Sequence, residues 1–103
     1  MVSIVESNLA DLQELCRRYG VRRLEVFGSA ATEAFDPARS DLDFLVEFLP
    51  GQQLGPWLRH YFDFQADLAH LFGRPVDLVL SAAVRNRYFR KELDRTRTLL
   101  YAA

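Results

Sequence analysis

The stretch from Val26 to Phe48, VFGSAATEAFDPARSDLDFLVEF, contains the strongest signals of fold and chemistry in the chain. It places a Gly-Ser pair directly after one apolar strand, and two carboxylates, Asp41 and Asp43, at the mouth of a second. Strand side chains alternate between faces, so both carboxylates are expected to point the same way. Because two neighbouring acids repel each other, we interpret the pair as a site for a divalent metal. The alternative is that Asp41 closes the loop and Asp43 is a solvated strand end.

The remaining apolar patterns predict a small sheet with helices packed on it. We expect strands at 24–27, 42–48, 76–80 and 98–101, and helices over 8–19, from 56 or 57 to 72, and after 86. The strand at 42–48 is apolar at its middle on both faces, which is typical of a central strand. The predicted fold class is therefore α/β, more specifically α+β, with a small mixed β-sheet of three to four strands.

Helical spacing and end signals define the predicted helices further. The residues of the second helix repeat at three- and four-residue steps, and this stripe from Trp57 onward is expected to form core. Asn8 or Ser7 can cap the first helix and Gly20 can end it. Asn86 is expected to cap the last helix.

Length and composition limit the range of functions. The chain has 103 residues, half of them hydrophobic, which suits one domain over residues 1–103. Its 13 basic and 14 acidic residues nearly cancel, so no direct nucleic-acid binding is expected. Cys16 is the single cysteine, which excludes an intrachain disulfide. No apolar stretch is long enough for a membrane span and residues 1–20 show no signal-peptide pattern, so we expect no membrane association and a cytoplasmic location.

A third acid lies inside the apolar strand 76–80, VDLVL. Val76 and Leu78 are expected on the opposite face from Asp77, and an unpaired buried carboxylate is costly. The metal inferred for the first two acids would supply its partner.

The Gly28-Ser29 turn adds a second component to this site. Glycine lets the backbone approach a ligand closely, and free amide groups at a helix start attract phosphate. Three acids beside such a turn favour a site for a nucleoside triphosphate and magnesium, with two ions able to assist an in-line displacement. The chain has no GxxxxGK[ST] loop and no Ser-His-Asp set, so phosphoryl or nucleotidyl transfer is the favoured chemistry.

These motifs in this order resemble the DNA polymerase β-type nucleotidyltransferase superfamily. The residues that carry the resemblance are Gly28-Ser29, the segment SDLDFLV from Ser40, and the segment VDLV from Val76. The length and the segment NRYFRKEL resemble the minimal nucleotidyltransferases, the MNT family, which are found beside HEPN-domain proteins. This resemblance implies a polymerase β-like palm.

The resemblance also implies roles for individual residues. Asp41, Asp43 and Asp77 would be catalytic and would bind two Mg2+ ions. Gly28, Ser29 and Ser40 would bind the ATP, with Gly28 and Ser29 at its β and γ phosphates. Where the family often has Arg-Gly after Gly-Ser, this chain has Thr32-Glu33.

The family further implies an antitoxin that transfers AMP from ATP to a tyrosine of a HEPN toxin partner. The main alternative is a catalytically inactive binding module that neutralises its partner by complex formation, a reading that Thr32-Glu33 favours. Transfer of a nucleotide to a small molecule would need an acceptor pocket, and a nucleic-acid polymerase would need a template grip that neither charge nor length supports.

Overall fold

A four-stranded mixed sheet forms the centre of the computed structural model, which describes residues 3–31 and 41–103. Its strands are β1 (Val21–Phe27), β2 (Leu42–Phe48), β3 (Val76–Leu80) and β4 (Thr98–Ala102), in the order β3-β2-β1-β4. β1 runs antiparallel to β2 and to β4, whereas β2 and β3 are parallel. The predicted α+β fold with a small mixed sheet is confirmed.

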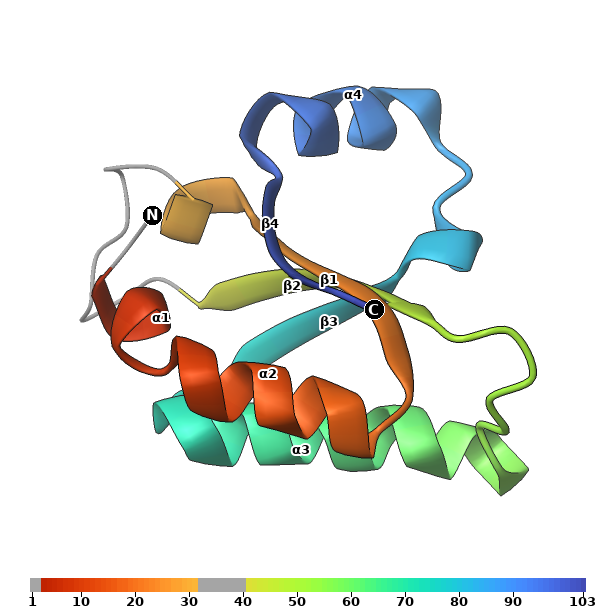
Figure 1. The fold of residues 1–103 in the computed structure, drawn as a ribbon. Helices are drawn as coiled ribbons and strands as arrows, with labels where there is room; N and C mark the ends of the chain where they lie inside the picture. Colours follow the sequence, from red (N-terminus) through yellow and green to blue (C-terminus); the bar gives the residue numbers. More distant parts are fainter. Residues whose placement is uncertain (1–2, 32–40) are drawn as a thin grey trace.

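Helices cover the two faces of this sheet unequally. The α-helices are α1 (Ser3–Ser7), α2 (Leu9–Arg18), α3 (Arg59–Phe72) and α4 (Arg87–Thr96), and the 3-10 helices are η1 (Gly28–Ala31), η2 (Pro56–Leu58) and η3 (Ser81–Ala83). The long helices α2 and α3 lie side by side on one face, and α4 lies over the other (Figure 1). The chain crosses from β2 to β3 through a connection that contains the 14-residue helix α3. Parallel strands such as β2 and β3 require a long crossover of this kind.

The hydrophobic core lies between the sheet and the α2–α3 layer. Alternate strand residues point into it, because strand side chains change face at every residue. Phe44 stacks on Phe72 of α3 with ring centroids 5.7 Å apart. The main core residues are Leu12, Leu15, Cys16, Leu24, Val26, Leu42, Phe44, Val46, Phe64, Leu68, Phe72, Val76 and Leu78.

The opposite face of the sheet is largely polar. Glu25 is 3% exposed there and pairs with Arg23 at 2.9 Å and with Arg97, just before β4, at 2.8 Å. Leu45, which faces Glu25 across the β1–β2 pair, is also buried. Strand β2 is thus covered on both faces, by apolar packing on one and by an ion-pair network around Leu45 on the other.

Two sequence predictions on the helices are wrong. Trp57 is 94% exposed because it precedes α3, in a left-handed backbone conformation at φ 56°, and the buried stripe starts only at Phe64. Asn8 does not cap α2 with its side chain, because its amide donates instead to the carbonyl of Ile4 in α1. The cap at Asn86 is confirmed, since its side chain accepts from the backbone N–H groups of Tyr88 and Phe89.

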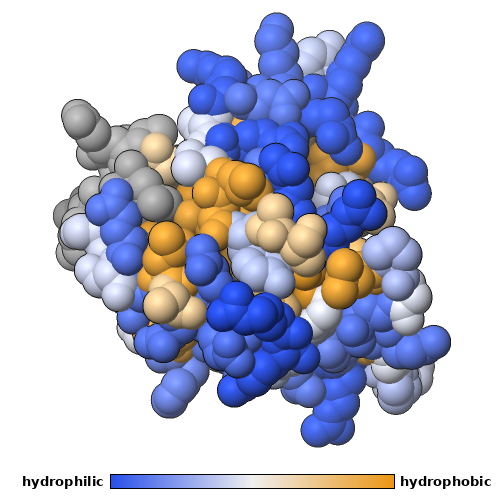
Figure 2. All heavy atoms as spheres, in the orientation of Figure 1, coloured by the Kyte–Doolittle hydropathy of each residue, from blue (hydrophilic) through white to orange (hydrophobic). Residues whose placement is uncertain are grey.

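The surface reflects this arrangement. On the face that Figure 2 shows, side chains over α4 are mostly hydrophilic, and apolar atoms appear in the band between α4 and α2. Leu99 of β4 contributes to the exposed apolar surface, at 49% exposure. Within residues 3–31 and 41–103, no helix is both long and apolar enough to cross a bilayer.

Candidate active site

Two of the three predicted acids face each other across the β2–β3 pair. Asp43 and Asp77 are direct partners in the parallel register, and neighbouring strands lie about 4.8 Å apart. Asp43 is half-buried and Asp77 is exposed. Asp77 was expected to be a buried carboxylate, and this is wrong, because β3 is the edge strand and its polar face is open.

Electrostatics couple these carboxyl groups. Burial raises the pKa of Asp43 from 3.8 to about 6, with a hydrogen bond to Asp77 and the charges of Asp77 and Asp41 acting in the same direction. A hydrogen bond between two carboxyl groups requires a proton on one of them. The ionised pair is therefore unfavourable in the absence of a counter-charge.

A hard cation fits this pair of side chains. Carboxylate oxygens are the ligands that Mg2+ prefers, and it usually takes one or two carboxylates and completes its coordination with water and phosphate. Asp41 lies just before β2, is exposed, and adds its charge to the site. Among the described residues, however, no three acidic, histidine or cysteine side chains lie close enough together to hold a metal ion.

Gly28 connects the Gly-Ser turn to the acids. Its φ is +71°, and a Cβ atom at this position would lie 2.8 Å from Oδ2 of Asp43. Only glycine fits both requirements. Its N–H donates to Oγ1 of Thr96 at 2.9 Å, at the end of α4, so this backbone donor is already used within the protein.

Ser29 and Ser40 are the other predicted nucleotide-binding residues. Ser29 follows in η1 and is half-buried. Ser40 and the Thr32-Glu33 pair lie outside the described residues.

A cleft of about 500 Å3 opens at the acids, on the β3 side of the sheet. This volume is in the usual range for small-molecule sites. Its walls come from five elements, β1, β2, β3, α3 and α4. Its lining residues are Phe27, Asp43, Tyr61, Phe62, Gln65, Asp77, Leu78, Val79 and Phe89. Phe89 of α4 packs edge-on against Phe27, with ring centroids 6.1 Å apart. Tyr61 packs edge-on against Phe62, with ring centroids 4.9 Å apart.

Three residues of this region were missed by sequence reasoning. Thr96, Gln65 and Phe89 reach the site from helices whose placement only the tertiary structure fixes. The one available signal was the four-residue spacing of Tyr61 and Gln65, which places both on one face of α3.

Comparisons with known proteins identify the family of this chain. The nucleotidyltransferase domain family matches residues 12–100. A relative from Methanocaldococcus jannaschii, named "Putative protein adenylyltransferase MJ0128", is 34% identical over 80 residues, which cover 78% of this chain and 76% of the relative.

Solved structures show the same fold. One described as a "putative minimal nucleotidyltransferase" superimposes with a TM-score of 0.73 at 30% identity, over 91% of this chain and 90% of that one. The Shewanella oneidensis tri-AMPylated HEPN toxin in complex with MNT antitoxin gives a TM-score of 0.66 at 18% identity, over 95% of this chain and 72% of the matched chain. At that identity the second likeness concerns the fold alone.

The mixed four-stranded sheet with its packed helices matches the nucleotidyltransferase fold. The family match extends over most of the chain, so the protein belongs to the nucleotidyltransferase domain family and is an enzyme of this kind. Its resemblance to the minimal nucleotidyltransferases is confirmed.

Proposed function

We propose that this protein is a magnesium-dependent adenylyltransferase that transfers AMP from ATP to a protein hydroxyl. The acceptor is a tyrosine of a HEPN toxin, and the chain acts as its antitoxin. The observation that carries this proposal is the Asp43–Asp77 pair, whose mutual repulsion calls for a cation, in an open cleft of about 500 Å3.

The proposed reaction is an in-line displacement at the α phosphorus. The acceptor oxygen forms a bond to that phosphorus, the bond to the bridging oxygen of the β phosphate breaks, and pyrophosphate leaves. The proton of the hydroxyl passes to the exposed carboxylate of Asp77 and from there to solvent. Magnesium, with two ions in the proposed complex, would neutralise phosphate charge and orient the α phosphate.

Each proposed site residue has a part in this scheme. Asp41, Asp43 and Asp77 would hold the Mg2+ ions through their carboxylate oxygens. Gly28, Ser29 and Ser40 would bind the triphosphate. Since the N–H of Gly28 is donated to Thr96, we assign Gly28 the role of permitting close approach rather than donating a hydrogen bond.

A protein acceptor suits the shape of the site. The cleft opens at the edge of the sheet and is lined by exposed aromatic side chains, with Phe62 54% and Phe89 40% exposed. A small chain has little surface to enclose a nucleotide and an acceptor together, so a second protein presenting its own hydroxyl completes the site. The name of the M. jannaschii relative supports a protein substrate.

The test is to incubate the protein with a HEPN-domain partner, ATP and Mg2+ and to weigh the partner by intact-mass spectrometry. We expect a mass increase of one or more AMP units, which EDTA prevents and which Asp77→Asn reduces at least 100-fold. The absence of any increase, or an increase that survives Asp41→Asn and Asp77→Asn, would refute the proposal.

The second candidate is a catalytically inactive module that neutralises its partner by binding. It is favoured by the observation that the described residues contain no three-ligand metal group. If Asp43→Asn and Asp77→Asn proteins silence an equimolar partner as fully as the wild type does, without ATP, this candidate is correct.

A further inference from the structure

Tyr61 and Gln65 of α3 bind the backbone of β3 on both sides of Asp77. The hydroxyl of Tyr61 donates to the carbonyl of Leu78, and the side-chain amide of Gln65 donates to the carbonyl of Val76 at 2.8 Å. The two donors are one helical turn apart on α3. They therefore hold the two peptide units that flank one predicted metal ligand.

Among the described residues these carbonyls have no strand partner, because β3 is the edge of the described sheet. Leu42 of β2 donates its N–H to the carbonyl of Pro75, so Pro75 and Asp77 direct their backbone groups toward β2. By the alternation of the strand, Val76 and Leu78 direct theirs outward. An exposed strand edge is normally the most adaptable part of a sheet, and α3 removes that freedom at this point.

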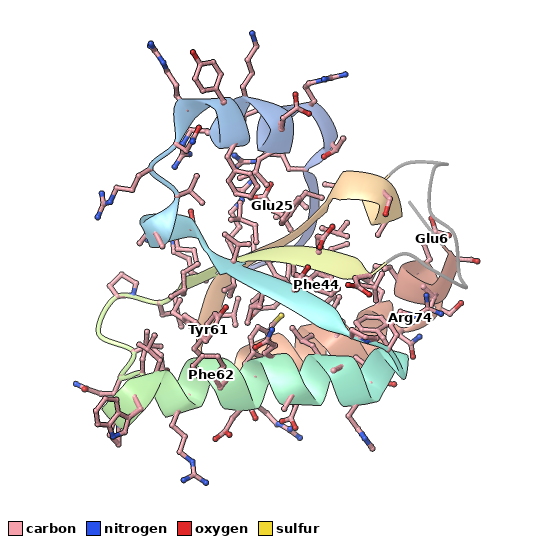
Figure 3. The ribbon with its side chains drawn as sticks, turned by 180° about the vertical axis from the view of Figure 1, so that it is seen from behind. Glu6, Glu25, Phe44, Tyr61, Phe62 and Arg74 are labelled. Carbon is pink, nitrogen blue, oxygen red and sulfur yellow. The ribbon has the colours of Figure 1, made fainter. Side chains whose placement is uncertain are left out.

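Both side chains also belong to the cleft. Tyr61 and Gln65 line it together with Asp43 and Asp77. Tyr61 extends from α3 toward the β3 strand that crosses above the helix (Figure 3). Burial raises the pKa of the Tyr61 phenol, and the charge of Asp77 raises it further.

We propose that Tyr61 and Gln65 are positioning residues that fix the Asp77 carboxylate opposite Asp43 for metal binding. The inference rests on the proposed function for the identity of the ligand. It adds that α3, an element with no predicted catalytic residue, determines the geometry of the site. Tyr61 and Gln65 touch neither metal nor substrate in this role and act through the β3 backbone.

The chain offers a matched control for each substitution. Tyr61→Phe removes one hydroxyl donor, and Tyr19→Phe removes the same group from its hydrogen bond to Asp67, which does not line the cleft. Gln65→Met removes one amide donor, and Gln13→Met removes the same group from its bond to the carbonyl of Leu100 at 3.2 Å. Each pair of variants removes the same donor group, once from a residue that lines the cleft and once from a residue outside it.

The primary measurement is the affinity of each protein for Mn2+ alone, by titration calorimetry and by electron paramagnetic resonance. We expect Tyr61→Phe and Gln65→Met to raise the Mn2+ dissociation constant about tenfold, the usual effect of losing a group that orients a ligand. Tyr19→Phe and Gln13→Met should stay within twofold of the wild type. Unchanged affinity in both cleft variants would overturn the proposal.

A second measurement separates this inference from the proposed function. Hydrogen exchange at the Asp77 amide, followed without metal, should accelerate in both cleft variants and stay unchanged in the two controls. If the wild type binds no Mn2+, the proposed function fails, and exchange at Asp77 then decides the positioning role by itself. Equal exchange rates in cleft variants and controls would overturn it.

Discussion

At the scale of single residues, Asp43 and its surroundings form the centre of the proposed site. The strand register places Asp77 directly opposite Asp43. The backbone of Gly28 lies so close to the Asp43 carboxylate that a side chain at position 28 would collide with it. A carboxyl group with a raised pKa in a cleft is a typical feature of functional sites. In the metal-free protein the ionised form of Asp43 is unfavourable, because the side chain is half-buried and lies beside Asp77.

Replacing Asp43 by Asn should stabilise the metal-free protein at pH 8 and leave stability unchanged at pH 4. Because the pKa of Asp43 rises from 3.8 to about 6 on folding, the folded state binds the proton more tightly, and stability falls as pH rises through that interval. For a half-buried group, screening reduces the gain at pH 8 to about 1 kcal/mol. Thermal unfolding in EDTA measures it.

Asp63→Asn, an exposed carboxylate of α3, is the control and should change stability little at either pH. A loss of stability in Asp43→Asn at pH 8 would show that the repulsion inferred here is absent.

Gly28→Ala should lose activity beyond its effect on stability. Its φ of +71° disfavours any side chain, and the new Cβ would lie 2.8 Å from the Asp43 carboxylate. Gly73→Ala has nearly the same φ, +64°, with nothing within 4 Å of the new atom. Both should be destabilised by about 1 kcal/mol, and only Gly28→Ala should lower AMP transfer, by tenfold or more. Similar activity in both variants would contradict the contact with Asp43.

At the scale of elements, β4 and α4 support the site from the polar face. Thr96 ends α4 and holds Gly28, and the next residue, Arg97, pairs with the buried Glu25 of β1 and with Asp94 at 2.8 Å. This connection joins the last turn of α4 to the strand that carries the glycine turn. Fixing Arg97 therefore also fixes Thr96.

Arg97→Met should destabilise the protein by about 2 kcal/mol. Removing one of the two partners of the buried Glu25 carboxylate leaves its charge less well compensated, with Arg23 as its one remaining ion-pair partner among the described residues. Arg95→Met removes an exposed pair with Glu92 on the same helix and should cost less than about 0.5 kcal/mol. Urea unfolding gives both values, and equal losses would show that the buried pair contributes no more than a surface one.

The sequence predicted most elements because periodicity and end signals are local. Strand Leu42–Phe48 and strand Val76–Leu80 were predicted with their observed bounds, and the pairing of Asp43 with Asp77 follows once the two strands are parallel neighbours. Trp57 was wrongly placed in the core, because helical spacing continues through a segment whose backbone is not helical. Thr96 was unpredictable, since a bond between residues 28 and 96 has no local signature.

At the scale of the whole molecule, one apolar core supports a polar working face. The α2–α3 layer buries one side of the sheet, and the acids, the glycine turn and the ion-pair network lie on or beside the other. This division lets the polar face carry costly charges while the opposite face supplies most of the burial.

Cys16 provides a probe of global unfolding. Its side chain is fully buried in the core, and burial raises the pKa of its thiol to about 12. The thiolate is the reactive form, so labelling by a disulfide reagent at pH 8 should proceed only through unfolding and slow as stabilising Mg2+ and ATP are added. Rapid labelling of the folded protein in the absence of denaturant would contradict the burial of α2 against the sheet.

The central claim, that this protein modifies its partner catalytically, is tested most directly by turnover. A substoichiometric amount of the protein is mixed with a HEPN partner, ATP and Mg2+, and the mass of all partner molecules is followed over time. We expect every partner molecule to gain AMP, and Asp43→Asn to leave the partner unmodified. A partner that stays unmodified while an equimolar amount of the protein still silences it would refute catalysis as the basis of neutralisation.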